Sequence, residues 1–594
     1  MSRKILLKAG LTVVASALLL PNISSAQELE EIVVTARQVE ETLQDVPVTV
    51  AVMSEEDLDR YNITNLVDAA KLVPNFQINL GGSGNGSNLF LRGVGSSSIS
   101  AAFDQSVAIN VDGVVVNIGR FIHNSYMDMG QLEVLKGPQS LYFGKSATAG
   151  VVSITTNDPD EEFEAMASVG YETEHEQTLF EGVISGPITD TFGARLALGK
   201  TKADELYRNL NPNAQNQWRG DESLNARLTL TWNPSDTVDV RFKYAYSEYE
   251  NDGPTGNTEE FCPEGSVQPT VALGNSVAIP GLDDCILNGN TSTADLLEPL
   301  RIGLPGRGAS GVPYLEQETS FTSLEIGWDI NPQFSLTSVT GYVDLEHQDL
   351  DIYDYNVGIF GGQHFNTYKS FSQELRLSSA LEGPVNFQFG VYYQDVSQDF
   401  LAFQFAANIG LVVPDPVTGN GYDYNKNHFL DTEVFSTYLA GYWDISETLE
   451  LTGGLRYTKE DKSGFITIPY VHTFLQGSFA APPLIDGLDF DDSNVSPEIA
   501  INWYLNDEIS VFAAYKEGFK SGGVDNSALP TASLSANNPD FPNFLIYQSE
   551  EAKGFEVGLK ARLLAGAMRF NATAFSYTYS DLQTQLFDSE AIQF

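Results

Sequence analysis

VDVRFKYAY, residues 238–246, alternates large apolar side chains with small or charged ones. Successive side chains of a strand point to opposite faces, so this stretch predicts a strand with one apolar and one polar face. Residues 449–457 and 555–563 repeat the pattern. An apolar face that ends in tyrosine, opposite a charged face, suits a strand between lipid and a wet interior. A soluble β-sandwich alternates in the same way, so the pattern alone leaves two fold classes open.

The connections between the candidate strands decide between these two classes. We count about 15 candidate strands from residue 163 onward, and their connections are alternately short and long. The short ones are residues 186–190, 233–236, 331–333, 444–448, 506–507 and 565–566, and the long ones are 251–318, 399–431, 462–489 and 524–548. Tight turns on one side and long loops on the other are typical of a transmembrane β-barrel. A sandwich has no reason to keep this rhythm, so the sequence predicts a barrel.

The first 26 residues predict an export signal. Arg3, Lys4 and Lys8 precede an apolar run over residues 10–20, and Ser24-Ser25-Ala26 forms a small-residue cleavage site. The apolar run is too short to cross a bilayer as a helix. The mature chain is therefore expected to begin at Gln27.

The composition excludes one class of partner. The formal net charge is −47, with 79 acidic against 32 basic residues. Binding to nucleic acid depends on basic patches that neutralise phosphates, so we expect no nucleic-acid partner.

Residues 37–158 follow a different pattern, which predicts a compact α+β domain. Ser54 followed by Glu55, Glu56 and Asp57 is typical of a helix start. Three later segments, residues 89–95, 107–113 and 131–138, are short strands punctuated by glycine or proline.

Several motifs of this domain and of the barrel resemble those of one family. They are LRGVG (91–95), VDGV (111–114), LEVLKGPQSLYFG (132–144), ATAGVVSI (147–154), SQELRLS (372–378) and YKEGFKSGG (515–523). In order and spacing they resemble the plug and barrel signatures of TonB-dependent outer-membrane receptors. The resemblance covers essentially the whole mature chain. It implies a signal peptide (1–26), a periplasmic tail (27–37), a plug domain (38–158) and a β-barrel (159–594).

The resemblance also sets expectations for the fold class and the chain length. The family has an all-β transmembrane barrel of about 22 strands with an N-terminal α+β plug in the lumen. About 15 strands are present here, so we expect a barrel that is incomplete at its C-terminal end.

A strand-forming segment in the tail resembles the TonB box of the family. It comprises Glu30, Glu31, Ile32, Val33, Val34, Thr35 and Ala36. Its β-branched centre suits addition as a strand to the sheet edge of a partner. The resemblance implies TonB and the ExbB–ExbD inner-membrane complex as partners, surrounding lipid and lipopolysaccharide, a small-molecule cargo and a monomeric receptor. The alternative for the segment alone is an ordinary first strand of a periplasmic domain.

Further site residues are expected from the resemblance and from the alternation. Arg92 and Lys136 of the plug are candidates for ion pairs with Glu374 and Glu556, which the alternation places on lumen-facing positions. Ordinary solvated lumen charge is the alternative for each pair. The apical loop of the plug is expected to face the cargo with Gly81, Gly82, Ser83, Gly84, Asn85 and Gly86.

The two cysteines, Cys262 and Cys285, lie in one long polar stretch. In an oxidising compartment such a pair favours a loop disulfide. Neither has a second thiol or a histidine at the spacing of a metal site, so a metal is not expected.

No catalytic constellation is found in the sequence. The six histidines are dispersed, and no nucleophile–base pair stands out. We therefore expect no enzyme, no metal and no cofactor other than a chelated iron in the cargo. The family implies TonB-dependent import, with a ferric siderophore as the first cargo and a vitamin, oligosaccharide or other small organic molecule as the alternative. A passive porin is the alternative of a different class, and it would need neither plug nor tail motif.

Overall fold

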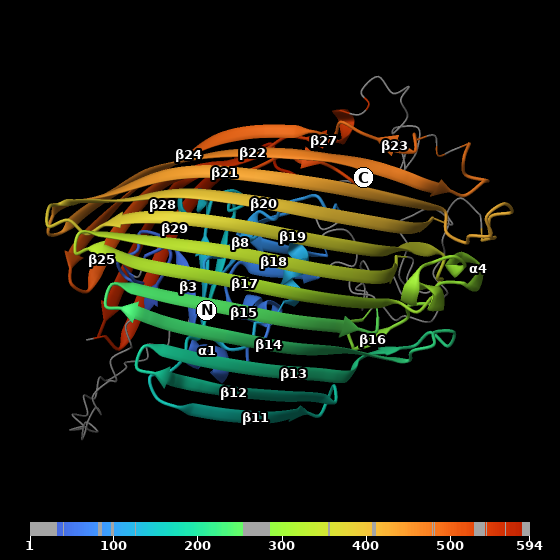
Figure 1. Cartoon of the computed structure of the whole chain (residues 1–594), viewed down its shortest axis with the longest axis horizontal. Helices are drawn as coiled ribbons and strands as arrows, with labels where there is room; N and C mark the ends of the chain where they lie inside the picture. The colour runs from blue at the N-terminus through green and yellow to red at the C-terminus, as the bar shows by residue number, and fades with distance from the viewer. Residues whose placement is uncertain are drawn as a thin grey trace, which may run out of the picture.

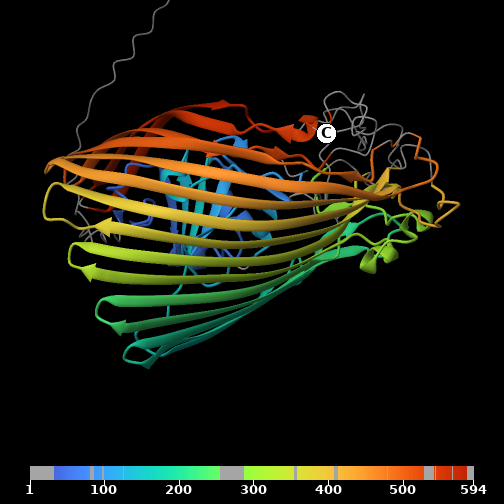
Figure 2. The same cartoon turned by 45° about the horizontal axis from the view of Figure 1, so that its top comes forward.

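The computed structural model describes residues 32–584, except residues 40, 81–85, 97–99, 125, 254–285, 354–356, 407–411, 478, 480, 528–540, 542 and 565. A long curved sheet forms a wall, and a smaller α+β domain lies inside its curve (Figure 1). The same arrangement is visible after rotation (Figure 2). The predicted combination of an all-β barrel wall and an N-terminal plug is confirmed.

The wall is one 17-stranded sheet in which sequence neighbours pair. Two members, β16 (Asn290–Thr291) and β23 (Leu484–Ile485), are two-residue strands. The other fifteen agree with the predicted number. They are β11 (Glu164–Glu172), β12 (Gln177–Thr189), β13 (Phe192–Asn209), β14 (Trp218–Ser235), β15 (Val238–Asn251), β17 (Tyr314–Asn331), β18 (Phe334–Ile352), β19 (Phe360–Ser379), β20 (Val385–Ala406), β21 (Tyr424–Ser446), β22 (Leu449–Val471), β24 (Phe490–Asn506), β25 (Ile509–Lys520), β28 (Glu550–Leu563) and β29 (Met568–Ser580).

The sheet order begins at β11 and ends at β29. Within the described residues these two end strands do not pair with each other, so the wall is an open sheet (Figure 2). No helix of the described residues is long and apolar enough to cross a membrane.

The alternation works as predicted. In β28 the side chains of Phe555 and Val557 point outward and are 63% and 51% exposed, whereas Glu556 between them is 1% exposed. The outward face also carries a row of tryptophans near the short turns. Trp232, Trp328, Trp443 and Trp503 each stand three residues before the end of their strand. Tryptophan is enriched at membrane–water interfaces, so this row marks one edge of the apolar band.

Several strands are longer than the sequence predicted. Residues 399–431 were expected as a loop, but β20 continues to Ala406 and β21 begins at Tyr424. Residues 462–489 were also expected as a loop, but β22 continues to Val471. The outward side chains there are polar, such as Asp399 and Asp431, because this part of the wall extends beyond the apolar band.

The long connections gather at one end of the wall, opposite the short turns (Figure 1). They carry α4 (Glu298–Arg301), the 3₁₀ helices η2 (Gly306–Ser310) and η5 (Asn543–Leu545), and the short strands β26 (Gly523–Val524) and β27 (Ile546–Tyr547). Leu296, Leu300 and Leu304 pack with Phe405 and Tyr422 into a small core at this end.

The plug is built on a five-stranded sheet in the order β3-β9-β10-β7-β8. Its strands are β3 (Val50–Ser54), β7 (Val107–Val111), β8 (Val114–Val116), β9 (Met129–Lys136) and β10 (Gly150–Thr156). A second sheet contains β4 (Phe76–Leu80), β5 (Ser87–Leu91) and β6 (Val94–Gly95). The plug core continues into wall residues such as Phe321, Val343 and Tyr368, so the plug packs directly on the barrel.

The plug helices start as the sequence predicted. Helix α1 (Glu55–Arg60) is capped by Ser54, whose side chain accepts a hydrogen bond from the Asp57 N–H. Helix α2 (Leu66–Leu72) is capped by Asn65 and ends before Pro74. Two short helical turns complete the domain, η1 (Gly119–His123) and α3 (Ser140–Phe143).

A tight hairpin presents Arg92 at the edge of the second sheet. Leu91 and Val94 are paired, so Arg92 and Gly93 form a two-residue turn. Both have positive φ, 54° and 83°, as a type I′ turn requires. Glycine accepts this conformation without strain, whereas arginine adopts it only when its surroundings hold it there.

Candidate functional site

The described part of the predicted TonB box is docked on the plug. Val33–Val34 forms β1 and pairs with β2 (Glu41–Thr42) in an antiparallel two-stranded sheet. The side chain of Val33 is 45% exposed, whereas Val34 and Ala36 are fully buried in a core that includes Leu135. Residues 32–36 of the predicted periplasmic tail are thus folded back onto the plug. Glu30 and Glu31 lie outside the described residues.

Side chains of β9 hold this segment by its backbone. Glu133 accepts hydrogen bonds on Oε1 from the Thr35 N–H (2.9 Å) and the Thr35 hydroxyl (3.1 Å). Gln131 donates from Nε2 to the Val33 carbonyl at 2.8 Å. The box is therefore held by two residue pairs of a sheet, three side-chain hydrogen bonds and the burial of Val34 and Ala36.

The Glu133 carboxyl is an unusual group for this position. Its side chain is 1% exposed, and this burial raises its pKa, although the bonds from Thr35 and Gln131 oppose the shift. Within the described residues its Oε2 atom has no hydrogen-bond partner. The docked box thus covers a carboxyl group that favours protonation.

Arg37, directly after the box, ties the segment to the wall. Its Nη1 donates to Glu450 Oε1 (3.1 Å) and to Thr452 Oγ1 (2.8 Å) on β22. Its Nε donates to Glu41 Oε2 at 2.7 Å. The box therefore lies between a plug strand and a wall strand.

One of the predicted plug–barrel pairs is formed. Arg92 Nη1 lies 3.1 Å from Glu556 Oε2, and both side chains are buried. Glu556 also accepts from the Tyr577 hydroxyl (2.9 Å), and the Arg92 guanidinium lies 3.7 Å from the centre of the Phe575 ring. These contacts bring the plug hairpin onto β28 and β29; the role of the pair in holding the plug stays a prediction.

Lys136 and Glu374 have other partners. Lys136 Nζ donates to the Pro74 carbonyl at 2.8 Å, within the plug. Glu374 accepts from the Tyr438 hydroxyl (3.2 Å) and lies 3.7 Å from Arg376, within the wall. Among the described residues neither forms the plug–barrel ion pair that the sequence suggested.

Other buried ion pairs join plug and wall, and the sequence analysis missed them. Their members are Lys145 with Glu460 (2.7 Å), Arg195 with Asp128 (2.7 Å), Lys243 with Asp112 (3.0 Å) and Arg120 with Asp349 (3.5 Å). The inward alternation of Lys243 was a signal in the sequence for one of these pairs. Its partner could not be read, because pairing across domains leaves no spacing in the chain.

The outer half of the lumen holds polar side chains with unused hydrogen-bonding capacity. Asn366, Phe400 and His428 lie in one cross-strand row on β19, β20 and β21. All three are buried, and within the described residues the Asn366 amide and His428 Nε2 have no hydrogen-bond partner. A plug segment packs against this row, because Ala101 contacts Phe400 and its carbonyl accepts from Gln398 (2.9 Å).

Two further predicted features fall wholly or largely outside the described residues. Cys262 and Cys285 lie there, as does the apical loop from Gly81 to Asn85. Gly86 is described and has φ +84°. A Cβ at this position would lie 2.9 Å from Arg120 Cγ, so the turn leaves room only for glycine.

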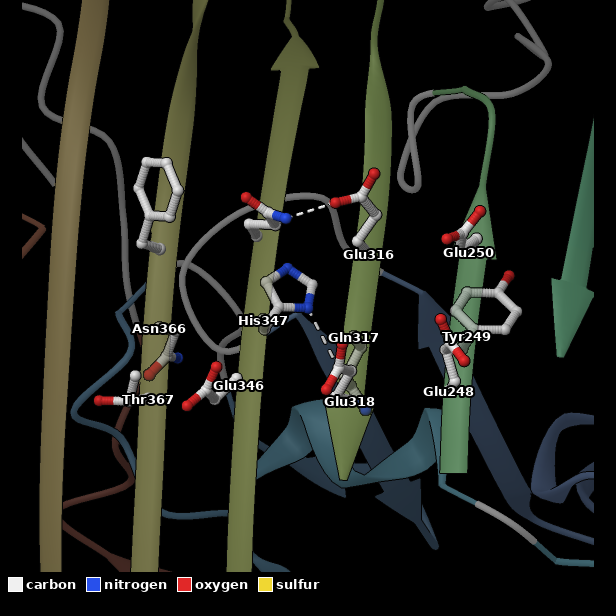
Figure 3. A pocket seen from close by; sticks show the side chains of 12 residues that line it. Glu248, Tyr249, Glu250, Glu316, Gln317, Glu318, Glu346, His347, Asn366 and Thr367 are labelled. Carbon is white, nitrogen blue, oxygen red and sulfur yellow. Dashed lines mark hydrogen bonds between the residues drawn. The ribbon is translucent and has the colours of Figure 1, made fainter. Parts of the chain in front are cut away.

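An acidic groove of about 230 Å³ lies over β15, β17, β18 and β19 (Figure 3). Glu248, Glu318 and Glu346 are directly opposite one another on three neighbouring strands. They continue the outward face that carries Tyr244 in β15. Glu248, Glu318 and Glu346 therefore face away from the lumen and are not part of a route through it.

Comparison with known proteins identifies the family. Residues 42–151 match the model of the TonB-dependent receptor plug domain, and residues 177–593 match the model of the TonB-dependent receptor-like β-barrel. The chain therefore belongs to the TonB-dependent receptor family, whose members are outer-membrane β-barrels.

Curated relatives include a vitamin B12 transporter from Vibrio vulnificus, 28% identical over 209 residues, which are 33% of this chain and 33% of the relative. The pesticin receptor of Yersinia pestis is 23% identical over 559 residues, which are 91% of this chain and 70% of the receptor. The matched part of the chain therefore spans about one third of the first relative and 70% of the second.

Solved structures share the fold. The ferric yersiniabactin uptake receptor of Yersinia pestis superposes with a TM-score of 0.71 at 18% identity, over 91% of this chain and 73% of that one. The ferripyoverdine receptor of Pseudomonas aeruginosa gives a TM-score of 0.65 at 13% identity, over 92% and 65%.

Proposed function

We propose that this protein imports a scarce small molecule across the outer membrane, driven by TonB. Cargo binds at the outer end of the lumen, and the box at residues 30–36 is then released into the periplasm. TonB adds to the box as a strand and transmits force from the ExbB–ExbD complex. The plug rearranges and the cargo enters, with one receptor chain acting as a monomer.

The docked segment Ile32–Ala36 carries this proposal. It is a β-branched strand at the start of the plug, and only two residue pairs hold it in a sheet. A partner that offers a longer sheet edge would replace these pairs with main-chain hydrogen bonds of the same kind. Such an exchange needs no new chemistry and is reversible.

A ferric siderophore is the first candidate cargo. The structurally similar receptors of Yersinia pestis and Pseudomonas aeruginosa are named for ferric yersiniabactin and ferripyoverdine. Asn366 and His428, whose amide and Nε2 have no hydrogen-bond partner within the described residues, supply hydrogen-bonding groups for a polar chelate. Vitamin B12 is the second candidate, because a curated relative is named as its transporter.

Passive diffusion is a poor alternative. A porin leaves an aqueous channel, whereas here a folded domain packs against the inner wall and forms buried ion pairs with it. A solute that enters the lumen would meet this packed domain.

The test follows cellular accumulation of a labelled ferric siderophore and of labelled vitamin B12. Cells without their own receptors for these compounds would produce the wild type, Val33→Pro or Val33→Thr. Proline removes the N–H needed for strand addition. Threonine keeps the backbone and replaces an exposed side chain, so it is the matched control.

We expect Val33→Pro to bind cargo at the cell surface without accumulating it, and Val33→Thr to behave as wild type. Equal accumulation by all three would reject TonB coupling through this segment. Accumulation of vitamin B12 alone would replace the siderophore as cargo.

A further inference from the structure

The segment between the box and the first plug strand is held by the wall through its backbone. Residues 43–46 follow β2 and precede β3. Four consecutive carbonyls of this segment, those of Leu43, Gln44, Asp45 and Val46, each accept a hydrogen bond from a wall side chain.

Three side chains supply these bonds. Lys560 Nζ donates to the Leu43 carbonyl at 2.6 Å and also to the Val46 carbonyl. Ser510 Oγ donates to the Gln44 carbonyl at 3.0 Å, and Asn502 Nδ2 donates to the Asp45 carbonyl at 2.6 Å. We call Asn502, Ser510 and Lys560 the carbonyl clasp.

The clasp is built from neighbouring strands of the wall. Its members come from β24, β25 and β28, and Ser510 and Lys560 are directly opposite each other in the sheet. All three side chains are at least 95% buried. The Phe512 ring lies 5.6 Å from Lys560 Nζ, and Gly558 leaves space for that ring, because a Cβ there would lie 2.2 Å from it.

A load applied at the box meets smaller groups of contacts before it reaches the clasp. The β1–β2 pairing consists of two residue pairs, which open one at a time when pulled from the end. Arg37 comes next, with two charge-assisted bonds to the wall, one to Glu450 and one to Thr452. At residues 43–46 four bonds from three wall side chains resist together, and two of them are also charge-assisted.

We propose that the carbonyl clasp is the mechanical stop that separates release of the box from unfolding of the plug. Force at the box straightens residues 37–42 and then loads the clasp; β3 is pulled from β9 only after the clasp opens. The proposal rests on the proposed function, because it assigns a role in TonB-driven transport. The seven residue steps from Ala36 to Leu43 span about 25 Å when fully extended.

The test pulls on the tail directly and does not need TonB. The protein, with cysteine replacing Gln27, is reconstituted in lipid bilayers and tethered to a force probe through that cysteine. Lys560→Met removes two bonds of the clasp while keeping the length of the side chain. Lys553→Met changes an exposed lysine of the same strand and is the matched control.

We expect wild type and Lys553→Met to show a rupture that precedes plug extension. Lys560→Met should lower this rupture force and raise its zero-force rate about tenfold or more, given the usual strength of hydrogen bonds to charged groups. Ser510→Ala, which removes one bond, should give an intermediate rate and serves if Lys560→Met fails to fold. Unchanged rupture in the variant that folds would overturn the proposal.

The two proposals can fail separately. If Lys560→Met lowers the rupture force but Val33→Pro leaves cargo uptake unchanged, the clasp proposal stands and TonB coupling is rejected. If Lys560→Met leaves the rupture force unchanged but Val33→Pro abolishes cargo uptake, only the clasp proposal is rejected.

Discussion

At the scale of single residues, the attachment of the box depends on a buried carboxyl group. Thr35 gives Glu133 two hydrogen bonds, and the box shields this group from water. Release of the box would return Glu133 to water and bring its pKa back toward the usual 4.5. Docking of the box is therefore coupled to protonation of Glu133.

This linkage predicts a pH dependence for docking. The docked state has the raised pKa, so it binds the proton more tightly than the released state. The favourable contribution of Glu133 to docking of the box is fully present below about pH 4.5 and is lost as pH rises through the raised pKa. The docking equilibrium changes by at most about tenfold per pH unit. A spin label on Val33→Cys, whose side chain is exposed, would report the docked fraction between pH 5 and 8.

We expect the docked fraction to rise on acidification. Glu133→Gln cannot titrate and should remove the dependence. A docked fraction that increases with pH would contradict the linkage.

A second prediction at this scale concerns Arg92 and Glu556. Glu556→Met removes the carboxylate and leaves the Arg92 guanidinium buried without a counter-charge. Breaking a buried pair on one side costs about 3–5 kcal/mol. Hydrogen exchange of β5 and β6 in bilayer-embedded protein should therefore accelerate strongly.

Glu551→Met is the control for this change, because Glu551 lies on the outward face of the same strand. Equal exchange in both variants would show that the pair does not hold the plug hairpin.

At the scale of elements, β10 is the central strand of the plug sheet. It pairs with β9 on one side and β7 on the other, and Gly150 opens it with φ +156°. A Cβ there would lie 2.3 Å from both the Leu135 carbonyl and Leu91 Cδ2.

Gly150→Ala should accordingly destabilise the plug by roughly 2–3 kcal/mol or more, because backbone and core must both shift. Calorimetry would show a lower unfolding temperature for the plug with the barrel transition unchanged. Gly477→Ala, where a Cβ meets no atom of the described residues within 4 Å, is the control. Identical plug transitions in the two variants would contradict the predicted steric conflict.

At the scale of the whole molecule, the outward face should obey the energetics of a lipid contact. Leu439 is 54% exposed and lies midway between Trp443 and Phe435 on β21. Leu439→Arg should reduce the folding free energy in bilayers by about 2–4 kcal/mol, as expected for a charge at the bilayer midplane.

Asp431→Arg, on the same face but beyond the apolar band, should change the folding free energy in bilayers by about 0–1 kcal/mol. Reversible unfolding in lipid vesicles measures both variants. Equal effects would mean that the band does not contact lipid.

The overall architecture could be predicted because it follows from local pattern. The alternation in residues 238–246 is confirmed by the pairing of β15 with β14 and β17. Strand ends were predicted less well, because outward positions beyond lipid are polar and look like loops, as at Asp399 and Asp431. The clasp could not be predicted, since it binds backbone carbonyls, which every residue has.

The tryptophan row has a consequence for where this protein can reside. Phe435 and Trp443 stand eight residues apart on β21, a distance of about 27 Å along the strand. At the usual tilt of transmembrane barrels this spans roughly 21 Å across the bilayer. A membrane of average thickness has a hydrocarbon core of about 30 Å, so it would have to thin around the wall. The bacterial outer membrane is thinner than average, so its thickness matches this apolar band more closely.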